Sequence, residues 1–69
     1  MLTVELKSRH KMPLYEQLYL KIRGLITEGE LVEGEKLPSE RGLALNLQIS
    51  RNTVTLAYEQ LYAEGYVEV

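Results

Sequence analysis

Apolar residues recur at helical spacing between Ser50 and Gly65, a stretch with both a start and a stop signal. The hydroxyl of Ser50 is suited to cap the free amides of a first helical turn, and Gly65 is suited to end a helix. Apolar residues between them fall at i, i+3, i+4 and i+7, which places them on one side of a helix. They are Val54, Ala57, Tyr58 and Leu61. The sequence therefore predicts a helix over 50–64 with one buried face.

A longer helix is predicted near the start of the chain. Pro13 suits the first position of a helix, because the amide that proline lacks has no partner there. Apolar residues continue at helical spacing as far as Ile26, so we expect a helix over about 13–28. Tyr15 and Tyr19 flank its apolar stripe at i and i+4, and aromatic residues at that spacing favour packing over ligand binding.

A short helix is predicted over 39–47, with Ser39 as its cap and Glu40 in its first turn, where negative charge meets the helix dipole favourably. Gly42 stands where a capping box would have Glu or Gln, which weakens this helix start by up to about 1 kcal/mol. Only Gln48 and Ile49 separate this helix from Ser50. Two short helices joined by a tight turn predict a helix-turn-helix.

Alternation of apolar and polar residues predicts a short strand near each end of the chain. Within 1–12 the alternation fits a half-buried strand, and a partly ordered terminal arm is an equally good interpretation. Residues 66–69 alternate with high strand propensity. The acidic segment 29–38 contains two glycines and a proline, and we interpret it as a solvated loop pinned to the core. Its carboxylates lack the spacing of a calcium-binding loop.

Composition is that of one small globular domain, with 69 residues, 45% of them hydrophobic and 26% charged. The absence of cysteine excludes disulfides and thiolate metal sites, and His10 is the only histidine. No apolar run approaches the roughly 18 residues of a membrane span, and the N-terminus lacks a signal-peptide layout. We expect a cytoplasmic protein. With no nucleophile–base pair and no glycine-rich phosphate loop, an enzyme is the weakest functional class.

The net charge of −2 at first argues against a nucleic-acid partner. Its distribution matters more than its sum, because the acidic residues gather at 28–35 and 59–68, away from Arg41 and Arg51. A weak local positive face is compatible with this arrangement.

Arg51 and Asn52 lie on the first turn of the third predicted helix and point away from its apolar stripe. Arginine can donate two hydrogen bonds to a guanine edge, and asparagine can pair with an adenine edge. The N-terminal turn of the second helix in a helix-turn-helix is the part that reaches bases in the major groove. Ser50, Thr53 and Thr55 can contact phosphates or thymine methyl groups without blocking that approach.

Three motifs occur in order along the chain. They are PLYEQLYLKIRGLI from Pro13, GEKLPSER ending at Arg41, and SRNTVTLAYEQLYAEGY from Ser50. Together they resemble the winged helix-turn-helix DNA-binding domain of the GntR family of bacterial transcription regulators, over about residues 13–67. They are most similar to the MocR-like branch, whose members carry a C-terminal domain resembling a pyridoxal-phosphate aminotransferase. A branch with a smaller C-terminal domain is the alternative.

The resemblance implies a mainly α fold, a three-helix winged helix-turn-helix over 13–69 that follows an N-terminal arm or strand over 1–12. The wing is expected to be incomplete, because the family's hairpin returns through a strand that would lie beyond Val69. Gln48 stands where the family usually has glycine, so it either adopts a left-handed conformation or the turn differs. No cofactor is expected in this chain, since pyridoxal phosphate would belong to the C-terminal domain.

The resemblance also implies contacts with double-stranded DNA. Arg41 matches a phosphate-binding position and Arg51 matches the arginine in the groove. Ser50, Asn52 and Thr55 match neighbouring contact positions, although Thr55 often has a basic counterpart in relatives. Ser39 could bind phosphate at its helix start, but capping alone explains Ser39 and Ser50 at least as well. The full-length protein is expected to form a homodimer, whereas the isolated domain is expected to be monomeric and to bind weakly.

A protein-interaction module on a winged-helix scaffold is the alternative function, since such domains also mediate protein contacts and this chain is acidic. The two functions predict different surfaces around Arg41 and Arg51. A contiguous positive face would favour DNA, and interruption by Glu40 or Glu59 would favour protein interaction.

Overall fold

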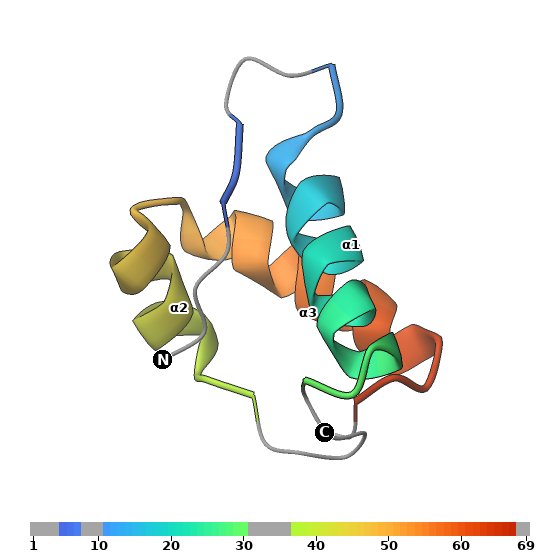
Figure 1. The fold of residues 1–69 in the computed structure, drawn as a ribbon. Coiled ribbons are helices and arrows are strands. Elements are labelled where there is room, and N and C mark those ends of the chain that lie inside the picture. Colours follow the sequence, from blue (N-terminus) through green and yellow to red (C-terminus); the bar gives the residue numbers. More distant parts are fainter. Residues whose placement is uncertain (1–4, 8–10, 31–36, 68–69) are drawn as a thin grey trace.

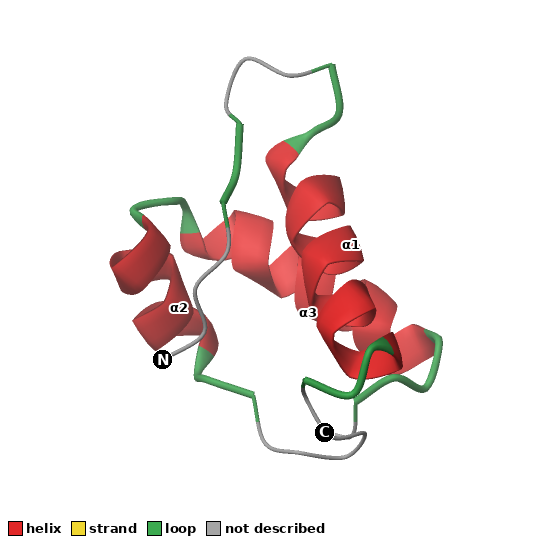
Figure 2. Ribbon diagram, in the orientation of Figure 1, coloured by secondary structure: helices red, strands yellow, loops and turns green. Residues whose placement is uncertain are grey.

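The structure is a computed structural model that describes residues 5–7, 11–30 and 37–67 (Figure 1). These residues form three helices joined by loops, which are α1 (Leu14–Thr27), α2 (Glu40–Leu47) and α3 (Arg51–Ala63) (Figure 2). Helix α3 packs against both α1 and α2, whereas the backbones of α1 and α2 do not approach each other closely. The fold is mainly α, as predicted, and α3 is its central element.

The two predicted serine caps are confirmed. The hydroxyl of Ser39 accepts from the backbone N–H of Gly42 at 3.0 Å, and that of Ser50 accepts from Thr53 at 3.2 Å. Gln48 ends α2 in the left-handed conformation, with φ 58° and ψ 45°. The turn between α2 and α3 therefore keeps a left-handed residue even though the residue is not glycine.

Helix α1 is slightly shorter than predicted, because Pro13 precedes the helix instead of opening it. Pro13 has an extended ψ of 150° while its carbonyl accepts from Glu16 and Gln17, both at 3.1 Å. It is therefore the N-cap residue, and its placement at the first helical position was wrong by one residue.

One hydrophobic core joins the three helices. Helix α3 contributes the complete stripe predicted from the sequence, and Val67 packs into the core after the helix has ended. The buried apolar residues are Leu18, Tyr19, Ile22, Leu43, Ala44, Val54, Ala57, Tyr58, Leu61 and Val67.

Neither predicted terminal strand is present in the part of the chain that the structure describes. Residues 5–7 and 66–67 have no strand structure, and the rest of both predicted strands, together with 31–36 of the acidic loop, lies outside the described residues. The backbone of Lys7 pairs instead with a side chain. The amide of Gln17 accepts from the Lys7 N–H at 2.8 Å and donates to its carbonyl at 2.9 Å. These bonds supply what a neighbouring strand would otherwise provide.

A polar cluster ties α1 to the C-terminal end of α3. The hydroxyl of Tyr19 donates to the carboxylate of Glu64 and accepts from Arg23 at 3.0 Å, while the Arg23 guanidinium lies 5.2 Å from the centre of the Tyr19 ring. The bond from Tyr19, helped by one from Gln60, lowers the pKa of Glu64 below its ordinary value. Tyr19 therefore packs, as predicted, and also joins two helices.

We expect Tyr19→Phe to raise the pKa of Glu64 toward its ordinary value of 4.5, because the bond from Tyr19 is the largest cause of the shift. Because folding lowers the pKa of Glu64, the ionised carboxylate stabilises the folded chain at pH values above its ordinary pKa. This stabilisation is lost as the pH falls through the pKa of the folded state. An NMR titration of the Glu64 carboxyl carbon measures the change. Tyr15→Phe is the control, and an unchanged Glu64 titration in Tyr19→Phe would contradict the assignment.

We expect Gln48→Gly to raise the free energy of unfolding by about 1 kcal/mol, because glycine adopts the left-handed conformation without a Cβ clash. Asn46→Gly, in the right-handed last turn of α2, should lower it by about 0.3 kcal/mol, the difference in helix propensity between the two residues. Urea denaturation of both variants checks the opposite signs. A loss of stability in both would show that Gln48 is not strained.

Candidate nucleic-acid interface

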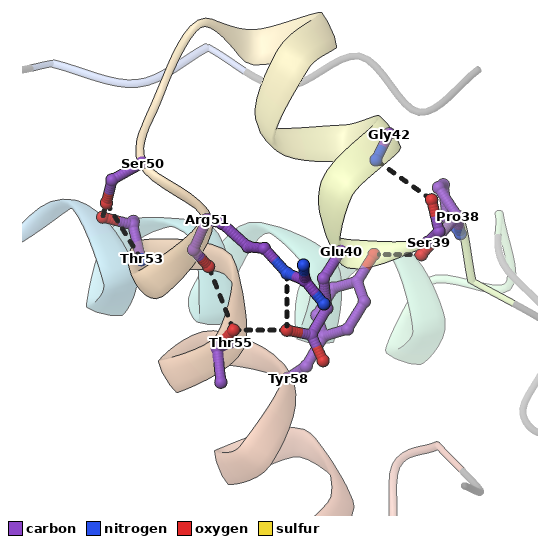
Figure 3. Close-up of polar contacts among 9 residues, drawn as sticks. All are labelled: Pro38, Ser39, Glu40, Gly42, Ser50, Arg51, Thr53, Thr55 and Tyr58. Atoms are coloured by element: carbon purple, nitrogen blue, oxygen red, sulfur yellow. Dashed lines mark hydrogen bonds and ion pairs between the residues drawn. The ribbon is translucent and has the colours of Figure 1, made fainter.

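The N-terminal end of α2 is held against α3 by a buried tyrosine. Tyr58 is 2% exposed, and its hydroxyl donates to the carbonyl of Pro38 at 2.8 Å, just before the cap of α2 (Figure 3). Burial raises the pKa of Tyr58 to about 12, so the hydroxyl keeps its proton and its role as a donor at neutral pH. This bond fixes where α2 begins relative to α3.

Glu40, the first residue of α2, contacts two predicted site residues on α3. Its carboxylate accepts from the hydroxyl of Thr55 and lies 4.0 Å from Nε of Arg51 (Figure 3). The Arg51 side chain is 68% exposed, and an ion pair this open to solvent stabilises a fold by at most about 1 kcal/mol. Arg51 can therefore exchange Glu40 for an external partner at little cost.

Ser50 and Thr53 form a second small group at the start of α3. Their hydroxyl oxygens lie 2.8 Å apart and share one hydrogen bond, in addition to the cap bond from the Thr53 amide. Two hydroxyls that share one bond retain one free hydrogen, which can be donated to an anion. One hydroxyl donor therefore remains at this helix start after the cap bond has formed.

The remaining predicted residues are at the surface but are not joined to these groups. Arg41 and Ser39 are exposed near the start of α2, and Asn52 is exposed on the first turn of α3. Among the residues that the structure describes, neither Arg41 nor Asn52 forms a hydrogen bond or ion pair. Both side chains are available to a ligand.

The positive surface is interrupted, because Glu40 contacts Arg51 directly. Glu59, farther along α3, is also exposed. A positive face interrupted by Glu40 or Glu59 was expected to favour protein interaction over DNA binding, and this arrangement therefore favours protein interaction. The geometry makes this a weak argument for protein interaction, since the Glu40 carboxylate is already engaged by Thr55 and Arg51 and its side chain is only 30% exposed.

Sequence reasoning missed two polar contacts at this site. Glu40 was expected to meet the helix dipole or to interrupt a positive face, whereas its carboxylate also reaches Thr55, 15 residues away along the chain. Tyr58 was assigned only to the core, although a buried tyrosine hydroxyl needs a partner and this signal was available. The identity of that partner, Pro38, depends on how the helices pack.

Other kinds of site find little support in the described part of the chain. It contains no group of three metal-ligating side chains, and none of its helices has the length and apolarity needed to span a bilayer. A recess of about 470 Å³ lies between the N-terminal arm and α1. Its lining includes Lys7 and Gln17 but none of the predicted site residues.

Comparison with known proteins agrees with the helix arrangement. The model of the family described as bacterial regulatory proteins, gntR family, matches residues 14–69. The chain is 45% identical over 67 residues to the uncharacterized HTH-type transcriptional regulator YhdI of Bacillus subtilis (strain 168). It is 46% identical over 57 residues to the probable rhizopine catabolism regulatory protein MocR of Rhizobium meliloti.

These two alignments cover 97% and 83% of this chain but only 14% and 12% of the relatives, so the chain matches a small part of each. A solved structure, YtrA from Sulfolobus acidocaldarius, a GntR-family transcription factor, matches with a TM-score of 0.91 and 41% identity. That match covers 96% of this chain and 70% of the solved chain.

We expect Tyr58→Phe to lower the free energy of unfolding by about 1 kcal/mol, because it keeps the buried ring but leaves the Pro38 carbonyl without its donor. For a domain of this size the melting temperature should fall by about 4–8 °C. Tyr62→Phe is the matched control, since Tyr62 is only half-buried. Equal melting temperatures for Tyr58→Phe and the parent chain would show that the bond contributes nothing to stability.

Proposed function

Because the chain belongs to the GntR family of bacterial regulatory proteins, we propose that it is the N-terminal, sequence-specific DNA-binding domain of a transcription regulator. DNA binding is the activity that membership of a helix-turn-helix regulator family implies. We further propose that α3 reads the major groove. The observation that carries this proposal is the exposure of Arg51 and Asn52 on the first turn of α3, where Asn52 lies opposite the buried face and Arg51 lies on the flank beside Glu40 of α2.

Each side chain then has a role suited to its chemistry. Arg51 donates to a guanine edge, and Asn52 pairs with an adenine edge. Arg41 binds a phosphate, which positions the domain without reading sequence. A second phosphate is bound by the free amides of the first turn of α3, together with the spare hydroxyl hydrogen that Ser50 and Thr53 share.

Two predicted residues act mainly through the protein itself. Thr55 donates to Glu40, so its proposed part is to hold Glu40 beside Arg51. The hydroxyl of Ser39 accepts from Gly42, so its proposed part is to cap α2, and its own hydrogen and the free backbone amides of this helix start can be offered to a phosphate.

We propose that the isolated domain binds weakly and that the full-length protein binds as a homodimer. The net charge is −2, and Glu40 reduces the attraction of Arg51 for phosphates. One domain supplies one reading helix, whereas operators of helix-turn-helix proteins pair two half-sites. A cytoplasmic location follows from this function. Any pyridoxal phosphate would belong to an aminotransferase-like C-terminal domain of the kind found in MocR-like regulators.

A protein-interaction module remains the second candidate function, and the observation that favours it is the Glu40–Arg51 contact. The two candidates differ in what Arg51 does. Reading of guanine requires the guanidinium itself, whereas a protein-binding surface has no preference for one duplex over another.

We expect Arg51→Ala to lower affinity for a duplex selected from random sequence by roughly ten- to a hundredfold, the usual value of an arginine–guanine contact. Fluorescence anisotropy at matched salt measures the loss, and the melting temperature should stay unchanged because Arg51 is exposed.

Lys21→Ala is the matched control, because it removes one exposed positive charge from α1, away from the proposed site. Its specific affinity should fall much less than that of Arg51→Ala. Failure to select any duplex, or equal affinities for Arg51→Ala and the parent chain, would reject base reading by α3.

A further inference from the structure

Two large hydrophobic side chains are exposed in the described part of the chain, Leu45 at 71% and Leu56 at 41%. Leu45 lies on α2, whereas Leu56 lies on the second turn of α3. A single exposed leucine needs no explanation by itself. The position of Leu56 relative to the proposed reading residues gives it a specific meaning.

Leu56 lies on the outermost face of α3. At 100° per residue, the stripe opposite the buried face of this helix contains four residues, all of them exposed. Along the helix, Leu56 lies between Asn52 and Glu59. The four residues are Asn52, Leu56, Glu59 and Ala63. This stripe is the part of α3 that would enter a groove most deeply.

The leucine side chain covers the surface next to Asn52. Side chains on a helix lean toward its N-terminus, and residues four apart lie about 5–6 Å from each other. Leu56 therefore extends the surface of Asn52 toward one neighbouring base pair. Thr55 is the other candidate for an apolar contact there, but its side chain is turned toward Glu40 on α2 (Figure 3).

We propose that Leu56 determines specificity by packing on the C5-methyl group of a thymine adjacent to the base pair that Asn52 reads. This inference rests on the proposed function of α3. Thymine is the base that presents a methyl group in the major groove, and leucine has no polar atom with which to read any other base edge. Against a guanine or cytosine edge, the same side chain would cover polar groups without pairing them.

The charge on the same stripe limits the reading surface. Glu59 follows Leu56 by three residues and presents an exposed carboxylate, which repels phosphates and finds no donor at a thymine. The apolar surface next to Asn52 therefore ends at Leu56, and a base beyond it meets a carboxylate, which can accept only from the amino group of a cytosine or an adenine.

Replacing thymine by deoxyuridine tests the contact, because the exchange removes the methyl group and nothing else. In a duplex selected by the chain, each thymine is replaced in turn and affinity is measured by fluorescence anisotropy at fixed low salt. We expect one position at which uracil lowers affinity about fourfold, the equivalent of one buried methyl group. In Leu56→Ala, thymine and uracil should bind equally at that position.

Two further variants keep the test independent of folding. Leu45→Ala removes an equally simple exposed leucine from α2 and should preserve the fourfold preference for thymine. Leu56→Met keeps an apolar side chain and should preserve the preference as well. Melting temperatures of all three variants confirm that each is folded.

The outcomes separate this inference from the function on which it rests. If no thymine shows a uracil penalty, or if the penalty persists in Leu56→Ala, the role of Leu56 is rejected while DNA binding by the domain stands. If the parent chain selects no duplex at low salt, both the proposed function and the role of Leu56 are rejected.

Discussion

The burial of one face of α3 is the constraint on which the rest of the structure depends. Helix α3 packs against both of the other helices, so its apolar stripe is fixed by the free energy of burying Val54, Ala57, Tyr58 and Leu61. Because the phase of one stripe sets the direction of every other residue on a helix, the same packing points Asn52 and Leu56 outward. Core formation and presentation of the candidate reading surface are therefore one event.

The bond between Tyr58 and Pro38 extends this constraint to α2. A buried hydroxyl needs a partner, and its bond to the carbonyl of the half-buried Pro38 places the start of α2 beside the first turns of α3. Glu40 then meets Arg51 and Thr55, although these residues come from different motifs. The sequence motifs around 37–41 and 50–55 thus form one surface because a core residue joins them.

Local signals in the sequence predicted most of the fold, but they could not predict the contacts between helices. The caps at Ser39 and Ser50 and the left-handed residue at Gln48 depend on neighbours within a few residues, which a pattern can show. The bonds that Glu40 makes depend on how α2 lies against α3, and no spacing rule contains that information. The absence of a strand at residues 5–7 also depends on a contact between segments, because the side chain of Gln17 pairs with the backbone of Lys7.

In the proposed DNA complex, a carboxylate beside the reading arginine favours specificity over affinity. Glu40 repels every phosphate equally, so it lowers binding to all sequences by about the same factor. It also restrains Arg51, whose free side chain would lose up to about 2 kcal/mol of conformational entropy on binding. A duplex whose guanine meets the terminal nitrogens of Arg51 while Nε stays beside Glu40 keeps this benefit, whereas at any other position Arg51 must first leave a pair worth at most about 1 kcal/mol. Glu40 is therefore compatible with a DNA-reading domain, and we expect that domain to bind DNA weakly but selectively.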